Sequence, residues 1–280
     1  MLTASIVIHN TPPRQLLRAI HCLLRSEVAK IFIIDNSPAD SLRHVLPGES
    51  RIVYRHVENR GFGAGHNIAM REAIAGNIDG LHLVMNADVC WDGDVLAPLT
   101  DYLSQNPDVG LVMPKVYYPD GALQYTCRML PTPIDLFAKR FLPKSITDKR
   151  MDRYLLADHD HDKELNCPYL LGSFLMFRNE ALADCGLFDE RFFMYPEDID
   201  ITRRIHMRWR TMYWPGVSII HEHAAASRKS RKMLKIHISN MIRYFNKWGW
   251  FIDPVRRRLN RRLRNSITPI PESMRPIARG

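Results

Sequence analysis

The sequence predicts an α/β protein with a mostly parallel central sheet flanked by helices and a helical C-terminal extension. Three observations support this prediction. Apolar runs typical of buried strands alternate with amphipathic segments through the first half of the chain. The C-terminal part has apolar residues at helical spacing only. The length of 280 residues and the hydrophobic fraction of 46% are enough for a substantial core.

Predicted strands and helices alternate in chain order. After a strand at 5–9, apolar residues from Leu16 to Leu24 recur at helical spacing. A glycine-rich loop at 59–67 leads into a second helix, and a short third helix follows from Asn179. The predicted strands span residues 5–9, 30–35, 51–55, 81–86, 109–113, 172–178 and 212–220.

The middle of the chain, residues 115–165, is rich in Pro, Asp and Lys and has weak periodicity. We interpret it as an irregular excursion or mobile flap, not as a separate domain. The sequence therefore predicts one domain over residues 1–227 and a helical extension over 228–280.

Composition excludes several classes of protein. The chain is neither collagen-like nor disordered, and no apolar run approaches the roughly 20 residues of a membrane-spanning helix. Residues 1–10 lack a basic region, so we expect no signal peptide. The five cysteines form no Cys-x-x-Cys pair, which favours buried thiols in a reducing compartment over disulfides or a zinc site. They are Cys22, Cys90, Cys127, Cys167 and Cys185.

The net charge of +9 is distributed unevenly. Residues 228–280 carry 15 of the 39 Lys and Arg residues but 2 of the 30 Asp and Glu residues, a net charge of +13 against −4 for the rest. This asymmetry suggests that the C-terminal extension meets an anionic surface.

Polar residues follow three predicted strands, where open parallel sheets bind ligands. Asp35 and Asn36 end the second strand, and Asn86 and Asp88 follow the fourth. Asp35 is either a turn residue, because Asp-Asn-Ser-Pro favours a turn, or a ligand-binding residue. The glycines of the loop at 59–67 either form an ordinary turn or let the backbone approach an anion at a helix N-terminus.

Asp88 is a candidate for holding a divalent cation, because one or two carboxylates suffice when a substrate supplies phosphate oxygens. The alternative is a solvated loop, which suits Asp92 and Asp94 better as acids at a helix N-terminus. His221 and His223 face one side of an extended segment and could reach a metal, or they could be surface histidines.

The densest acidic cluster is Glu197, Asp198 and Asp200. Repulsion among these carboxylates and the aromatic residues before them favour a raised pKa, which suits a general base. Alternatively, the acids form a charged first helical turn paired with Arg203 and Arg204.

In their order and spacing, these motifs resemble the inverting family 2 glycosyltransferases of the GT-A fold, the fold of nucleotide-diphospho-sugar transferases. The likeness is greatest to the branch with bacterial rhamnosyltransferases and other surface-polysaccharide glycosyltransferases, and it spans about residues 3–227. It rests on Val7-Ile8-His9-Asn10, Ile33-Ile34-Asp35-Asn36-Ser37, Asn59-x-Gly-Phe-Gly-x-Gly-x-Asn67, Asn86-Ala-Asp88 and the segment from Gly172 to Asp200.

The resemblance implies a role for each motif. Asp198 would be the general base, with Glu197 as the second candidate, and His221 or His223 would contact the metal or the diphosphate. Asp88 would hold Mg²⁺ or Mn²⁺, in a motif with one carboxylate where many relatives have two. The donor-binding residues would be His9, Asn10, Asp35 (on the nucleobase), Asn36, Gly61, Gly63, Gly65, Asn67, Asn86 and Asp88. Gly172 and Tyr195 would lie on the acceptor side.

The implied activity is sugar transfer from a nucleotide-diphospho donor, dTDP-rhamnose or a UDP-sugar, to a hydroxyl of a lipid-linked or polysaccharide acceptor in cell-surface glycan synthesis. One alternative is a non-catalytic nucleotide- or carbohydrate-binding relative. Another is a nucleic-acid-binding protein, which the acidic body argues against.

The C-terminal extension predicts two helices. The first has apolar residues at steps of four and three, and we expect at least its first part to dock on the domain. These residues are Leu234, Ile238, Met241, Phe245, Trp248 and Ile252. In the second helix, Val255, Leu259 and Leu263 share one side and arginines surround them, which is typical of a membrane-surface anchor. A solvated face and a subunit contact are the alternatives. We therefore expect a cytoplasmic, peripheral protein at the inner face of the membrane, with no nucleic-acid partner.

Overall fold

The computed structural model describes residues 1–135, 144–222 and 231–271. Within these ranges, nine strands form a central sheet in the order β3-β2-β1-β4-β10-β6-β11-β5, with β8 paired to β11. The strands are β1 (Leu2–Ile8), β2 (Val28–Asp35), β3 (Ile52–His56), β4 (Leu81–Met85), β5 (Val89–Cys90), β6 (Val109–Tyr117), β8 (Leu165–Asn166), β10 (Phe174–Arg178) and β11 (Arg210–His221).

The sheet is mostly parallel, as the sequence predicts. β1 pairs in parallel with β2 and β4, as do β2 with β3 and β6 with β11. β10 is the antiparallel strand between β4 and β6. The apolar runs become strands that are buried on both faces, as in Ile31 to Ile34, whose side chains are fully covered.

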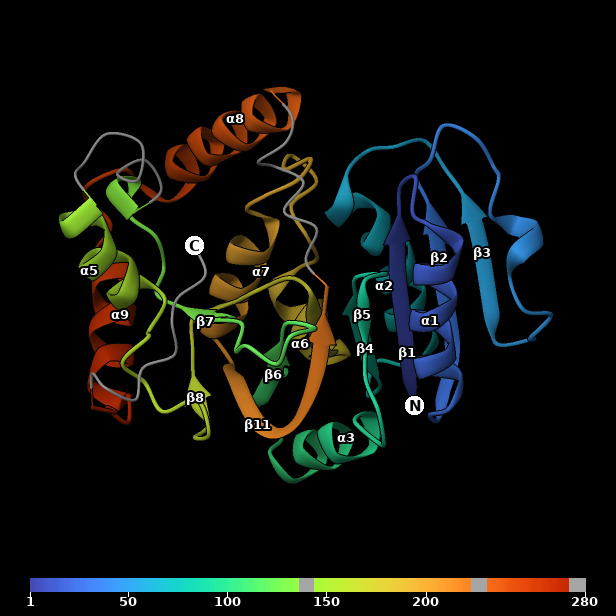
Figure 1. Ribbon diagram of the computed structural model, residues 1–280, viewed down its shortest axis with the longest axis horizontal. Coiled ribbons are helices and arrows are strands. Elements are labelled where there is room, and N and C mark those ends of the chain that lie inside the picture. The colour runs from blue at the N-terminus through green and yellow to red at the C-terminus, as the bar shows by residue number, and fades with distance from the viewer. Residues whose placement is uncertain (136–143, 223–230, 272–280) are drawn as a thin grey trace.

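Helices cover both faces of the sheet (Figure 1). α1 (Pro13–Leu24) connects β1 to β2, and α2 (Phe62–Gly76) connects β3 back to β4. Because these right-handed connections run in opposite directions along the sheet, the two helices lie on opposite faces. The other helices of this part are α3 (Leu96–Gln105), α6 (Asn179–Cys185), α7 (Glu197–His206) and the short η1 (Arg43–Val45).

A second core lies beside the main one, between the middle segment and the C-terminal helices. Buried Tyr125, Leu130 and Tyr154 pack here with Tyr244 and Phe245. The middle segment forms β7 (Cys127–Arg128), which pairs with β9 (Tyr169–Leu170), and α5 (Lys144–Tyr154). The sequence analysis missed α5 because its eleven residues carry few apolar side chains. No helix in the described ranges combines the length and apolarity needed to cross a bilayer.

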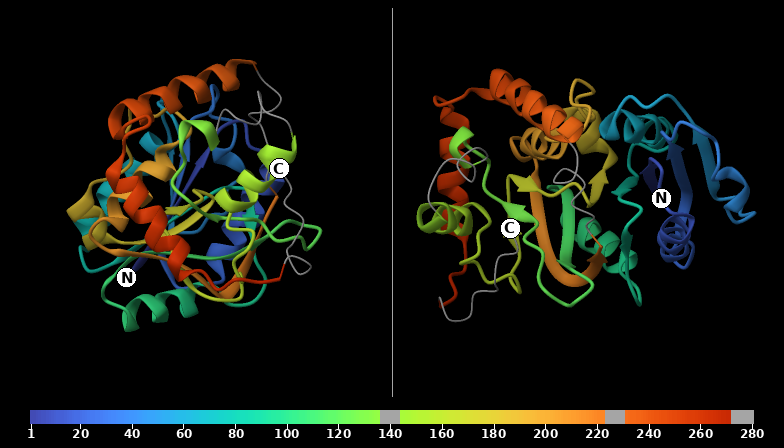
Figure 2. Two further views of the ribbon diagram at one scale, coloured as in Figure 1. Left: turned by 90° about the vertical axis from the view of Figure 1, so that its left-hand side faces the viewer. Right: turned by 45° about the horizontal axis from the view of Figure 1, so that its top comes forward.

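The extension forms α8 (Arg231–Trp248) and α9 (Pro254–Ser266) at the end of the molecule away from β3 (Figure 2). The part of α8 before Asn246 docks on the protein through one side only: Met241 and Phe245 are buried, whereas Leu234 and Ile238 are exposed. The apolar side of α9 docks on the protein as well, since Leu259 and Leu263 are buried. These two leucines are therefore not available to a bilayer. The five cysteines are all free, with Cys90 and Cys185 partly exposed.

Candidate active site

A pocket of about 370 Å³ opens at the carboxyl ends of β1 and β2. It is lined by His9, Asn36, Ser37, Pro38, His56, Val57, Glu58 and Asn59. Asp35 lies beneath it, fully buried, and accepts hydrogen bonds from the Ser37 amide (2.8 Å) and the Tyr54 hydroxyl (2.7 Å). Both carboxylate oxygens of Asp35 thus fix the turn that forms the pocket. The backbone amide of Asn10 donates to Ser37 Oγ (2.9 Å) and ties the end of β1 to the same turn.

The glycine-rich loop packs tightly against the segment that leads to α7. A Cβ atom at Gly61 would lie 2.2 Å from the carbonyl oxygen of Phe193, and one at Gly63 would lie 2.8 Å from Cβ of Phe188. Gly61 also has a φ of 103°, which favours glycine. Gly65 is similarly close to β1. Close packing between chain segments therefore explains these glycines, and it fixes the N-terminus of α2 beside the approach to α7.

The side chain of Asn67 pins the same segment. Its amide nitrogen donates to the carbonyl oxygen of Phe188 and to Glu190 Oε1 (both 2.9 Å), and its oxygen accepts from the Phe188 amide (3.0 Å). These contacts hold the irregular segment before α7 against α2. Among the described residues, Asn67 is not one of those lining the 370 Å³ pocket.

Asp88 and His221 come together from the loop after β4 and the end of β11. Asp88 Oδ1 lies 3.3 Å from His221 Nε2, and Asn86 Nδ2 lies 3.5 Å from the same nitrogen. His221 Nδ1 lies 2.7 Å from Gln124 Oε1, and because a carbonyl oxygen only accepts, Nδ1 is the donor; in the neutral ring the lone pair is then on Nε2. His223 lies outside the described residues.

This donor set fits a divalent cation. A carboxylate oxygen and an imidazole lone pair face one another, and Gln124 fixes the ring orientation as outer partners of metal-binding histidines do. In the described part of the chain, no group of three or more His, Cys, Asp or Glu forms a closed metal site. Two protein ligands are sufficient for Mg²⁺ or Mn²⁺ when substrate phosphates complete the coordination.

Asp198, in the first turn of α7, is half-buried and held by backbone amides. Gly172 N donates to Oδ2 (3.1 Å) and Ile199 N donates to Oδ1 (2.8 Å), and the Tyr169 hydroxyl lies 3.5 Å from Oδ2. Burial raises the pKa of Asp198, and the amides and Arg128 oppose this rise. A Cβ atom at Gly172 would lie 3.0 Å from Cβ of Asp198, so a glycine lets the backbone approach the carboxylate.

Glu197 has a different environment from its neighbour. It is buried beside Gly63, and its Oε2 has no hydrogen-bond partner among the described residues. Burial, and to a lesser extent the charge of Asp198, raises the pKa of Glu197 to about 8. Glu197 therefore holds its proton at neutral pH, which leaves Asp198 as the better base of the pair.

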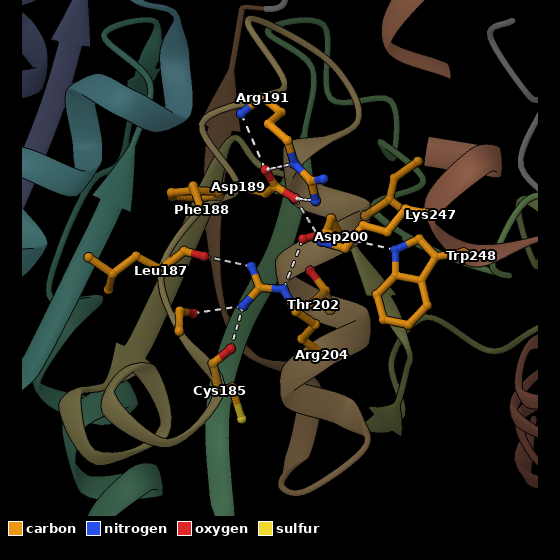
Figure 3. A network of polar contacts seen from close by, with 12 residues as sticks. Cys185, Leu187, Phe188, Asp189, Arg191, Asp200, Thr202, Arg204, Lys247 and Trp248 are labelled. Carbon is orange, nitrogen blue, oxygen red and sulfur yellow. Dashed lines mark hydrogen bonds and ion pairs between the residues drawn. The ribbon is translucent and has the colours of Figure 1, made fainter. Parts of the chain in front are cut away.

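Asp200 is the centre of a polar network that joins α7 to α8 (Figure 3). It accepts from Arg204 Nε (2.8 Å), Trp248 Nε1 (2.8 Å) and Lys247 Nζ (2.7 Å). Arg204 also donates to the carbonyl oxygens of Cys185 and Leu187. The predicted pairing of the acidic turn with Arg204 is thus confirmed.

Arg203 has another partner. Its guanidinium forms two hydrogen bonds (2.7 and 2.8 Å) to Asp253, which lies before α9, and both side chains are buried. The three acids of the cluster therefore have different surroundings: the raised pKa of Glu197 favours its protonated form, Asp198 is the candidate base, and Asp200 connects α7 to α8.

One side of Asp198 is formed by residues that the sequence analysis did not single out. Tyr169 and Arg128 come from the paired strands β9 and β7, with the Arg128 guanidinium 5.8 Å from the centre of the Tyr169 ring. Tyr195 packs its ring against His237 of α8, with the ring centres 5.0 Å apart. No short motif marks Tyr169, Arg128 or Gln124, because they enter the site through the irregular middle segment.

Comparisons with known proteins agree with this architecture. The model of the family "Glycosyl transferase family 2" matches residues 3–186. A curated protein, N-acetylglucosaminyl-diphospho-decaprenol L-rhamnosyltransferase of Mycobacterium tuberculosis, is 29% identical over 215 residues, which cover 71% of this chain and 68% of that protein.

Solved structures share the fold at low identity. The crystal structure of GalNAc-T7 with UDP, GalNAc and Mn²⁺ has a TM-score of 0.57 at 15% identity, covering 79% of this chain and 43% of that one. The mannosyltransferase PcManGT from Pyrobaculum calidifontis, in complex with GDP-Man and Mn²⁺, has a TM-score of 0.56 at 17% identity, covering 86% of this chain and 64% of that one. The chain thus spans less than two thirds of either structure and shares with both the GT-A fold. Because the family match extends over most of the chain, from β1 to the end of α6, the protein belongs to glycosyl transferase family 2.

Proposed function

We propose that the protein is an inverting glycosyltransferase that moves a sugar from a nucleotide-diphospho donor to a hydroxyl of a lipid-linked or polysaccharide acceptor. The observation that carries the proposal is Asp198: a half-buried carboxylate at the start of α7, held by two backbone amides beside a protonated Glu197. The name of the mycobacterial relative supports dTDP-rhamnose as the first donor to test, with UDP-sugars next, and a lipid diphosphate as the acceptor carrier.

Asp198 takes the proton of the acceptor hydroxyl as the hydroxyl oxygen attacks the anomeric carbon. The bond between that carbon and the diphosphate breaks at the opposite face, and the electron pair leaves with the nucleoside diphosphate. One base and one displacement invert the anomeric configuration. A divalent cation at Asp88 and His221, when bound, would neutralise the charge of the departing diphosphate.

The donor occupies the edge formed by β1, β2 and α2 in this proposal. The 370 Å³ pocket beside Asn36 takes the nucleobase and ribose, supported by the turn that Asp35 fixes.

We also propose peripheral contact with an anionic membrane at its cytoplasmic face, through a different surface from the one the sequence predicts. Nine large apolar side chains are exposed in the described part of the chain, and five of them lie on α8 and the turn after it. These are Leu234, Ile238, Ile242, Phe251 and Ile252. In this proposal the exposed apolar residues of α8, not the buried ones of α9, provide the apolar part of the contact. The arginines of α9 provide its positive charge.

Flotation with liposomes containing anionic lipid tests this contact. We expect the variant Ile238→Ser/Ile242→Ser to float less than the wild type, because it removes exposed apolar area without disturbing the core. The matched control is Ile78→Ser, an exposed isoleucine at the end of the molecule near β4. Equal flotation of the α8 variant and the wild type would contradict the proposal.

A thermal-shift screen of nucleotide sugars, with and without Mn²⁺, tests the donor class directly. A ligand that binds the folded protein at 100 times its Kd adds about 2.7 kcal/mol of stability. We expect stabilisation by one nucleotide-diphospho sugar, increased by Mn²⁺, and transfer from that donor to a prenyl-diphosphate-linked sugar. Binding without transfer or hydrolysis would favour the non-catalytic alternative.

A further inference from the structure

A pocket of about 660 Å³, larger than the 370 Å³ pocket at the end of β1 and β2, lies at the other end of the molecule. It lies between α5, the segment 129–134 and α9. Its lining consists of Met129, Thr132, Pro133, Ile134, Arg150, Arg153, Trp250, Phe251, Arg256, Arg257, Asn260, Arg261, Arg264 and Asn265. We call it the arginine pocket, since six of these residues are arginines.

Three of the six arginines have their charge or hydrogen bonds satisfied by the protein. Arg150 pairs with Asp135 (2.6 Å), and Arg264 pairs with Asp158 (2.7 Å). Arg256 is buried beneath the pocket and donates to the carbonyl oxygen of Trp250 (2.9 Å), among other backbone groups. These three arginines form the walls and the floor of the pocket.

The other three, Arg153, Arg257 and Arg261, form no ion pair with a carboxylate among the described residues. Arg257 and Arg261 are one helical turn apart on α9, and Arg153 belongs to α5 across the pocket. Like charges gathered in this way repel one another unless an anion lies between them. Guanidinium groups bind phosphate oxygens with strong, bidentate hydrogen bonds, so a phosphate is the anion that suits them best.

The rim of the pocket is apolar. Ile134 is 45% exposed and Phe251 is 66% exposed, and both line the opening, with Ile252 next to Phe251. A ligand that joins a phosphate to a hydrocarbon chain would satisfy both the guanidinium groups and this rim. A free sugar phosphate would leave the apolar rim in water.

The pocket shares two chain segments with residues that interact with Asp198. Met129, in its lining, follows Arg128, and Arg153 precedes Tyr154. Arg128 and Tyr154 both interact electrostatically with Asp198, and the Met129 amide donates to the Tyr154 carbonyl oxygen (3.0 Å), which joins the two segments. On each of these two segments, a residue that lines the arginine pocket is therefore next in sequence to a residue that interacts with Asp198.

We propose that the arginine pocket binds the diphosphate of a lipid-linked acceptor whose sugar hydroxyl faces Asp198, with Arg153, Arg257 and Arg261 as the phosphate-binding residues. This inference rests on the proposed function, since it gives the acceptor a site. The proposed ligand is a prenyl diphosphate and not the headgroup of a bulk phospholipid.

The test measures binding of farnesyl diphosphate, which has the diphosphate and the hydrocarbon chain but no sugar, to the full chain. We expect Arg257→Ala/Arg261→Ala to weaken this binding by about tenfold or more, because two charge-assisted contacts are lost. The matched control, Arg258→Ala/Arg262→Ala, removes the same charge from exposed positions of α9 outside the pocket and should bind nearly as the wild type does. Equal weakening in both variants, or in neither, would overturn the proposal.

Two further measurements separate the sources of the phosphate. Binding to vesicles of phosphatidylcholine, with and without phosphatidylglycerol, measures contact with bulk headgroups. If Arg257→Ala/Arg261→Ala lost vesicle binding but bound farnesyl diphosphate as the wild type does, the proposal would be overturned. Nucleotide-sugar binding should stay unchanged in the pocket variant. If farnesyl diphosphate binds through the arginines but no donor supports transfer, the pocket stands and the proposed function fails.

Discussion

At the residue scale, two adjacent carboxyl groups differ in protonation because their surroundings differ. Glu197 is enclosed and lacks a partner for Oε2, whereas Asp198 accepts from the amides of Gly172 and Ile199. Amide hydrogen bonds stabilise the charged form of a carboxyl group, and burial stabilises the neutral form; at Glu197 burial outweighs the backbone hydrogen bonds. A neutral Glu197 also removes the repulsion that would otherwise disfavour the charged form of Asp198.

The raised pKa of Glu197 makes stability depend on pH. Its pKa is about 8 in the folded protein and 4.5 ordinarily, so the folded state keeps a proton that the unfolded state releases. The contribution of Glu197 to stability is therefore complete below about pH 4.5 and is lost as pH rises to about 8, by at most about 1.4 kcal/mol per pH unit. In Glu197→Gln this fall should be absent in unfolding midpoints measured from pH 5 to 9. The control Glu180→Gln, at an exposed position, should keep the wild-type slope; parallel curves for all three proteins would contradict the assignment.

Gln124 would act on a metal bound at Asp88 and His221 by fixing the His221 ring. Replacing Gln124 by Leu removes the acceptor that fixes the ring, and losses of this kind typically weaken metal binding about 10- to 100-fold. The measurement is the Mn²⁺ concentration that half-saturates the thermal shift produced with nucleotide. Gln124→Glu keeps an acceptor and should restore most of the affinity. An unchanged Mn²⁺ dependence in Gln124→Leu would show that His221 is positioned by other contacts.

At the element scale, the C-terminal helices are joined to α7 by buried charge. Arg203 in α7 is paired with Asp253, which also caps α9 by accepting from the Arg256 amide (2.8 Å). Removing α9 by truncation would therefore leave a buried guanidinium unpaired and disturb the helix that carries Asp198. A chain ending at residue 252 is for this reason a poor probe of membrane contact.

Asp253→Ala measures that connection. We expect it to lower the free energy of unfolding by about 3–5 kcal/mol, because Arg203, at 1% exposure of its side chain, keeps its charge without a partner. Urea unfolding gives the value. The control Asp158→Ala breaks a pair between α9 and the middle segment that is more than 20% exposed at both side chains, and it should cost about 1 kcal/mol or less. Similar losses in both variants would contradict a special role for the buried pair.

At the scale of the whole molecule, the sequence predicts the strands well because buried parallel strands are continuous apolar runs, as at 30–35 and 81–86. The motif residues also come together at one edge, in pairs such as Asp88 with His221. Burial could not be predicted in the same way. The apolar stripes of α8 and α9 look alike in sequence, and only the second core decides that Leu259 is covered while Ile238 is not.

The charge distribution has a similar explanation. The extension carries most of the excess positive charge, but several of its arginines serve the fold, as Arg256 does by binding backbone carbonyls and Arg264 by pairing with Asp158. Sequence reasoning counts all of them as available to an anionic surface. The structure gathers a smaller set of arginines, without a carboxylate partner among the described residues, at one pocket: Arg257 and Arg261 of α9 with Arg153 of α5.

The central claim is that Asp198 is the base of a sugar-transfer reaction. The most direct test compares Asp198→Asn with the wild type, in transfer from the donor that the thermal-shift screen identifies, and in binding of that donor. The account predicts that kcat falls by about 10²–10⁴-fold while the donor's Kd changes little, because the amide cannot accept the acceptor's proton. Transfer by Asp198→Asn at the wild-type rate would contradict it.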